Sequence, residues 1–178
     1  MITVSIGVTE VVNSNPQWLE DAAVRIGARA LELEDQQRTQ RGLNAEAEEL
    51  WVGTAADASR IVGQRIETDQ RELHRAVEQV QTALETAGSE LSATRTAVVE
   101  LVQTLTSQGW QVADDGAVSV RPGEPLDRHA KVGPTNEMRV RLLAADNTVK
   151  VQSLLAQFEK QDSTAADRIR AAAAAAAN

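Results

Sequence analysis

The stretch EELWVGTAADASR, residues 48–60, lies between two long polar segments and decides how the chain folds. It places Trp51, one of three tryptophans, two positions before Gly53 and ahead of a run of small residues. A helical hairpin must reverse the chain within a few residues, and glycine supplies the backbone freedom that such a turn needs. We therefore predict a turn at residues 51–53 between two long helices, with the Trp51 indole covering the open end of their apolar seam.

The segment that follows this turn has apolar residues at helical spacing. They recur at about 3.6 residues per step, which is the spacing of one face of an α-helix. The members of this stripe are Val62, Ile66, Leu73, Val77, Val80, Leu84, Ala87, Leu91, Val98, Val102 and Leu105. Because no proline interrupts the stripe, the sequence predicts one helix over residues 54–108 with Gly109 as its C-terminal cap.

A second long helix is predicted before the turn, over residues 16–50. Asn15 is a favourable N-cap, and Pro16 suits the first helical position. The apolar stripe of this helix is interrupted over residues 34–42 and resumes at Leu43, Ala47 and Leu50. This gap is either a solvated length of the helix or a break at Gly42, and we expect the helix to continue through it. Helices of this length need a partner for their apolar faces, so the two are expected to pack together.

The segment WQVADDGAVSV, residues 110–120, predicts a small β-hairpin. A three-residue loop with Gly116 in the left-handed conformation brings the apolar side chains of both strands onto one face. These side chains are Trp110, Val112, Val118 and Val120.

Prolines and glycines over residues 121–134 prevent a continuous helix and predict a linker. A C-terminal helical segment is expected over residues 135–177, returning along the long hairpin, and residues 1–16 are expected to dock against the bundle. The predicted fold class is all-α. It is an elongated helical bundle in a single domain over residues 1–178, built on a helix-turn-helix hairpin.

The composition disfavours several classes of function. A formal net charge of −8 disfavours nucleic acid and anionic membranes as partners. No run approaches the roughly 18 apolar residues that span a bilayer, and no Sec-type signal peptide is visible. The two histidines, His74 and His129, are far apart, there is no cysteine, and no motif of a nucleophile elbow or phosphate loop occurs. We predict a non-enzyme with no catalytic residues, no cofactor and no metal.

The ordered set of motifs resembles a known family. A helix, a Trp-x-Gly turn and a second helix that begins with small residues are similar to the Trp-x-Gly proteins exported by the ESX (type VII) secretion systems of actinobacteria. The likeness is strongest to the N-terminal helical domains of the longer members. It includes VTEVVNSNP at residues 8–16, GWQVADDGAVSVRPG at 109–123 and DSTAADRIRAA at 162–172, so it covers most of the chain.

The resemblance implies a secreted substrate, or the targeting and partner-binding domain of one, with Trp51 and Gly53 as the recognition motif. It implies a cognate Trp-x-Gly protein, a secretion chaperone or the export ATPase as partner. It also implies a cytoplasmic protein that is exported to the cell envelope or beyond. The export signal of the family is a tyrosine followed four positions later by an acidic residue. This chain has no tyrosine, so a partner that carries the signal is one route to export.

An alternative function is a structural coiled-coil or helical-bundle adaptor unrelated to secretion. In that case the long helices dimerise through the same apolar seams. The sequence leaves monomer and homodimer both open. A last helix that folds back on the hairpin can complete the bundle within one chain, whereas a bare length of seam favours a dimer.

Overall fold

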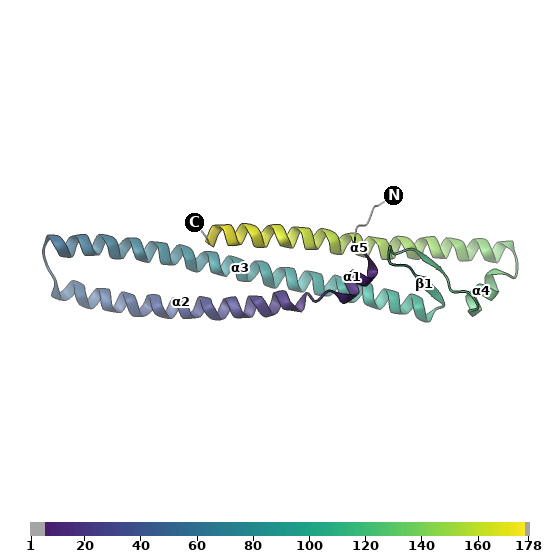
Figure 1. Ribbon diagram of the computed structural model, residues 1–178, viewed down its shortest axis with the longest axis horizontal. Coiled ribbons are helices and arrows are strands. Elements are labelled where there is room, and N and C mark those ends of the chain that lie inside the picture. The colour runs from purple at the N-terminus through teal and green to yellow at the C-terminus, as the bar shows by residue number, and fades with distance from the viewer. Residues whose placement is uncertain (1–5, 177–178) are drawn as a thin grey trace. The chain divides into compact units, whose positions relative to one another are not determined.

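The computed structural model describes residues 6–176 and is mostly helical with one small antiparallel sheet, as the sequence predicts. The elements in chain order are α1 (Val8–Asn13), α2 (Gln17–Leu50), α3 (Thr54–Ser107), β1 (Trp110–Val112), β2 (Val118–Val120), α4 (Pro125–Ala130) and α5 (Pro134–Ala176) (Figure 1). They form two compact units. Among the described residues, unit 1 holds residues 6–17 and 87–164, and unit 2 holds residues 18–86 and 165–176.

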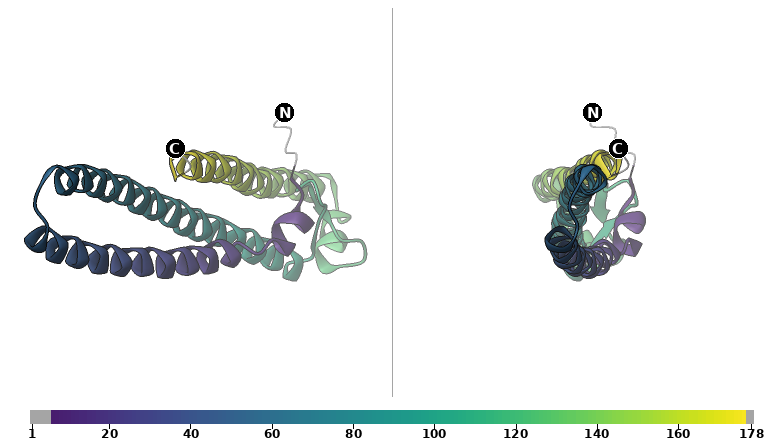
Figure 2. Two further views of the ribbon diagram at one scale, coloured as in Figure 1. Left: turned by 60° about the vertical axis from the view of Figure 1, so that its left-hand side comes forward. Right: turned by 90° about the vertical axis from the view of Figure 1, so that its left-hand side faces the viewer.

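In unit 2, α2 and the first part of α3 lie side by side and antiparallel, as two views show (Figures 1 and 2). Their buried and half-buried side chains recur every seven residues, which is the heptad spacing of a coiled coil. We call this line of contact the α2–α3 seam. Its members at seven-residue steps are Ala23, Ala30, Gln37 and Asn44 on α2 and Ala56, Gly63, Gln70, Val77 and Leu84 on α3.

A polar cluster fixes the register of the α2–α3 seam. Gln37 is buried, and its Nε2 donates a hydrogen bond to the backbone carbonyl of Gln70 at 2.9 Å. The Nε2 of Gln70 in turn donates to Oε1 of Gln40 at 2.8 Å. Because an unsatisfied buried amide is costly, these bonds favour this register over any shifted one.

The first part of the predicted apolar stripe on α3 does not lie in the seam. Val62, Ile66 and Leu73 are exposed, while Gly63 and Gln70 occupy seam positions. The stripe repeats about every 3.6 residues and the seam every 3.5, so the stripe drifts about 20° per heptad around the helix. The expectation that the whole stripe packs against other helices is therefore wrong for this part of α3.

A similar correction applies to α2. This helix is continuous through the polar gap, as expected, but the apolar residues that follow the gap do not return to the seam. Leu43 and Leu50 are exposed, and Ala47 is exposed as well. In this part of α2, the half-buried residues Gln40 and Asn44 form the seam instead. Because their side chains are polar, the apolar pattern of the sequence did not include them.

In unit 1, α1 docks onto α3. Val11 is fully buried, and the guanidinium of Arg95 donates to the Val12 carbonyl through Nη2 at 2.8 Å and Nε at 3.2 Å. The Thr9 amide donates to Oδ1 of Asp114 at 2.7 Å. The expected docking of the N-terminal segment is confirmed from residue 6 onward, and residues 1–5 lie outside the described part of the chain.

The predicted β-hairpin also lies in unit 1. Trp110 pairs with Val120 and Val112 with Val118, so that all four side chains share one face. Trp110 is 4% exposed, and the Val118 amide donates to Oγ1 of Thr148 on α5 at 2.9 Å. Gly116 has φ +80°, the left-handed conformation that the sequence predicts.

The predicted linker over residues 121–134 is not uniformly irregular, because it contains the short helix α4. Pro125 stands at the start of α4, where its fixed φ suits the first helical turn. The Asp127 carboxylate accepts hydrogen bonds from Nζ of Lys131 at 2.8 Å and from the Gly123 amide at 2.9 Å. These bonds, with Lys131 as the larger cause, lower the pKa of Asp127.

We predict that Asp114→Ala loosens α1 in a pH-dependent way. The hydrogen bonds from Thr9 lower the pKa of Asp114 below its usual value of 3.8. A lowered folded-state pKa means that the carboxylate stabilises the fold above pH 3.8 and loses this effect as the pH falls through the lowered pKa. Hydrogen exchange of the Thr9 amide should be faster in Asp114→Ala at neutral pH, and the difference from the wild type should shrink in acid.

The control for this prediction is Asp162→Ala, which removes an exposed carboxylate from α5. It should leave the exchange rate of Thr9 unchanged at every pH. Equal exchange in the wild type and Asp114→Ala at neutral pH would contradict the assigned hydrogen bond.

Candidate functional site

The candidate site is the segment between α2 and α3, where the two sequence-predicted residues lie together. The Trp51 amide still donates to the Ala47 carbonyl at 3.1 Å, and the Gly53 carbonyl accepts from the Asp57 amide at 3.0 Å. Gly53 has φ +118°, and no described atom lies within 4 Å of the position that a side chain would take. Glycine is therefore required here by the backbone conformation and not by lack of space.

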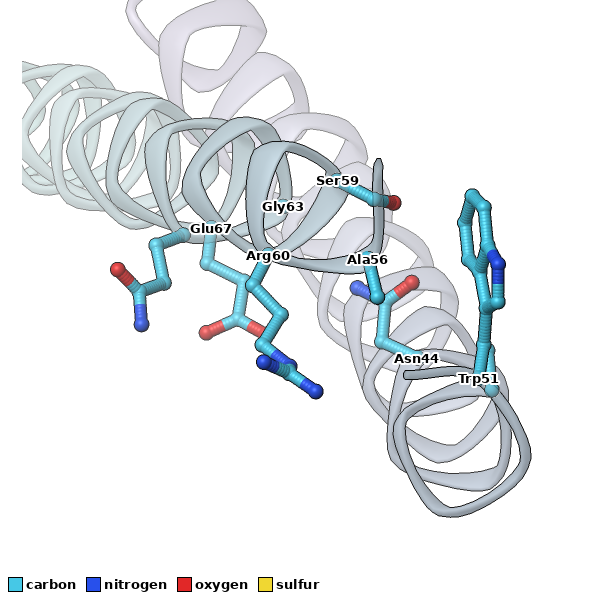
Figure 3. A pocket seen from close by; sticks show the side chains of 9 residues that line it. Asn44, Trp51, Ala56, Ser59, Arg60, Gly63 and Glu67 are labelled. Atoms are coloured by element: carbon cyan, nitrogen blue, oxygen red, sulfur yellow. The ribbon is translucent and has the colours of Figure 1, made fainter. Parts of the chain in front are cut away.

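Trp51 is 50% exposed, so half of the indole lies open to solvent between α2 and α3. Figure 3 shows the ring standing beside the ends of the two helices, next to Asn44 and Ala56, with Arg60 and Glu67 farther along α3. The indole thus lies beside the last layers of the α2–α3 seam.

A small cavity of about 80 Å³ lies under the indole. Its lining includes Asn44, Trp51, Ala56, Ser59, Arg60 and Glu67. A space of this size holds a few water molecules. Drug-sized ligands and cofactors need about 300 Å³ or more. The site is therefore suited to surface contact and not to enclosing a ligand.

The charged groups of this region are arranged as solvated helix surface. Arg60 pairs with Asp57 one turn before it on α3. Among residues 6–176, no group of three or more histidine, aspartate or glutamate side chains could hold a metal ion. Within the same part of the chain, no helix has the length and apolar character needed to cross a membrane.

The two histidines lie in different units. His74 is in the α2–α3 seam, with its Nε2 3.4 Å from Oε1 of Glu78, and its buried Nδ1 has no hydrogen-bond partner among the described residues. His129 is exposed on α4 in unit 1. The structure does not bring them together.

The sequence did not predict the seam residues that line the cavity with Trp51. Asn44 and Ala56 belong to the seam series, and the next members along it are Gln37 and Gly63. The signal that could have found them is a seven-residue repeat of small and polar residues. It was hidden by the stronger apolar stripe, which has a slightly different period.

Comparison with known proteins finds no family model, no curated protein and no solved structure that matches this chain.

We predict that Gly53→Ala destabilises unit 2 whereas Gly42→Ala does not. A side chain at a left-handed position costs about 1–2 kcal/mol. Gly42 lies inside α2 with open space around it, so alanine there should stabilise the helix by about 0.5–1 kcal/mol. Urea unfolding of both variants measures the difference. Equal stability of the two variants would contradict the assigned conformation of Gly53.

Proposed function

We propose that this chain is a Trp-x-Gly-like helical protein associated with type VII (ESX) secretion, either a secreted substrate or the targeting and partner-binding domain of one. The observation that carries the proposal is the half-exposed indole of Trp51, presented by a turn whose backbone requires Gly53. Indoles are enriched at protein interfaces because one side chain offers a large apolar area and a hydrogen-bond donor.

The chemistry of the turn supports a protein partner. The cavity beneath Trp51 is too small for a substrate or a cofactor, and the net charge of −8 disfavours nucleic acid. An exposed aromatic anchor beside a polar rim is the arrangement that dominates many protein interfaces. In the proposed complex the indole inserts into a pocket of the partner, and Gly53 holds the turn that presents it.

The proposed partner is a cognate Trp-x-Gly protein, a secretion chaperone or the export ATPase. It binds the chain in the cytoplasm before export to the cell envelope or beyond. Because the chain has no tyrosine, the partner supplies the tyrosine-based export signal of the family.

The second candidate is a structural coiled-coil adaptor unrelated to secretion. The heptad spacing of the α2–α3 seam favours it, because coiled coils commonly serve as assembly elements. Under this function the chain binds other helices but is not exported, and its binding does not depend on the residue 51–53 turn.

Replacing Trp51 tests the proposal. In an actinobacterial host with a type VII system, Trp51→Ala should reduce export of the chain at least about tenfold, since interface indoles often contribute 2 kcal/mol or more. The melting temperature should stay within a few degrees of the wild type, because half of the ring is already in water.

Trp18→Ala is the matched control, since Trp18 is a more exposed tryptophan at the other end of α2. Its export should equal that of the wild type. Normal export of Trp51→Ala would remove the recognition role. Failure of the wild type itself to be exported, with helix binding intact, would favour the adaptor.

A further inference from the structure

Four large apolar side chains lie exposed on one flank of the hairpin in unit 2, and we call them the flank patch. They are Leu43 on α2 and Val62, Ile66 and Leu73 on α3. Val62 is 57% exposed and Leu43 is 62% exposed. Single exposed apolar residues are ordinary in proteins, but the members on α3 follow one helix face, and groups of exposed apolar residues on one face mark interaction sites.

All four residues lie on the same flank because of their relation to the seam. Leu43 precedes Asn44 and Val62 precedes Gly63. Ile66 and Leu73 precede the half-buried Glu67 and His74, which continue the α2–α3 seam at four-residue steps from Gly63 and Gln70. In an antiparallel coiled coil, the residues that precede seam positions on both helices face one side, and those that follow face the other. The Asn44 side chain lies 3.6 Å from the position of a Gly63 side chain, so Leu43 and Val62 flank one layer of the seam.

The same flank is already covered by α5 farther along α3. Three- and four-residue steps from Leu73 lead to Ala76 and Ala83, which also precede seam residues. Ala76 is 5% exposed, and Ala83 lines a groove together with Ala171 and Ala172 of α5. The flank patch therefore continues, in line, a surface on which a helix already packs.

The charge around the flank patch favours a basic partner over a second copy of this chain. Asp69 lies on the same face between Ile66 and Leu73, and Glu46 lies on the same flank of α2. Residues 18–86 and 165–178, which make up unit 2, contain 15 acidic and 10 basic side chains. Two copies of unit 2, each with this excess of acidic side chains, repel each other, whereas a helix rich in lysine and arginine is attracted to it.

We propose that the flank patch binds an amphipathic helix of another protein, in line with α5. This helix presents apolar side chains at three- and four-residue spacing to Leu43, Val62, Ile66 and Leu73. Its edges carry lysine or arginine opposite Asp69 and Glu46. The inference rests on the partner-binding part of the proposed function, but it involves neither Trp51 nor export.

The probe for this proposal is a synthetic peptide of about three heptads, with leucine at the apolar positions and arginine at the edges. A second peptide has glutamate in place of every arginine. Fluorescence anisotropy with the full chain should show binding of the arginine peptide and not of the glutamate peptide. Ile66→Glu and Val62→Glu should each weaken binding about tenfold or more.

Leu31→Glu is the matched control. Leu31 is exposed on α2 but directly follows a seam residue, so it lies on the opposite flank. It should change binding less than about twofold. Leu31, Val62 and Ile66 are all exposed, so the melting temperatures of the three glutamate variants should match that of the wild type. Trp51→Ala should bind the peptide normally, which separates this surface from the role proposed for the turn.

Four results would overturn the proposal. The first is that the arginine peptide does not bind, and the second is that both peptides bind equally well. The third is that Leu31→Glu loses binding of the arginine peptide while Ile66→Glu retains it. The fourth is a stable homodimer in light scattering that Ile66→Glu converts to a monomer, which would assign the flank patch to a second copy of this chain.

Discussion

The register of the α2–α3 seam is the constraint on which the rest of unit 2 depends. Small residues such as Ala30 and Gly63 let the two backbones approach closely, and the side-chain amides of Gln37 and Gln70 are hydrogen-bonded across the seam in this alignment. Polar layers in a coiled coil reduce stability but select the alignment. This alignment sets the end of α2 against the start of α3 and leaves residues 51–53 to make the turn, with Gly53 in a conformation that other residues rarely adopt.

The same seam explains why large apolar residues are found outside it. Around Gly63 and Gln70 the seam is lined by small and polar residues, and the large apolar side chains Ile66 and Leu73 lie outside it on the flank. The indole of Trp51 stands at the end of the seam, where few neighbours can cover it. Both the turn and the flank patch thus expose apolar surface of unit 2.

Local patterns in the sequence predicted the elements, while long-range contacts decided what they bury. The stripe on α3 predicts a helix because a 3.6-residue period is a local property, and Gly116 predicts the hairpin loop for the same reason. No local pattern shows that Asp114 accepts from Thr9, since 105 residues separate them. A local pattern also does not show that Gln37 is buried in the seam while Leu43 is exposed, because the burial of each residue depends on the facing helix α3. The position of Trp51 and Gly53 between two helices was predicted from the sequence, but the neighbouring seam residues Asn44 and Ala56 were not.

The most direct test of the seam register is a disulfide between Asn44→Cys and Gly63→Cys. The natural chain has no cysteine, so any cross-link reports this pair alone. The Nδ2 of Asn44 lies 3.6 Å from the position of a Gly63 Cβ, so the two residues share one layer of the seam. The account predicts rapid cross-linking within one chain, measured by mass spectrometry. The pair Asn44→Cys and Gln70→Cys, about 10 Å out of register, should remain reduced. Faster cross-linking of this second pair, or cross-linking only between chains, would contradict the assigned register of the α2–α3 seam.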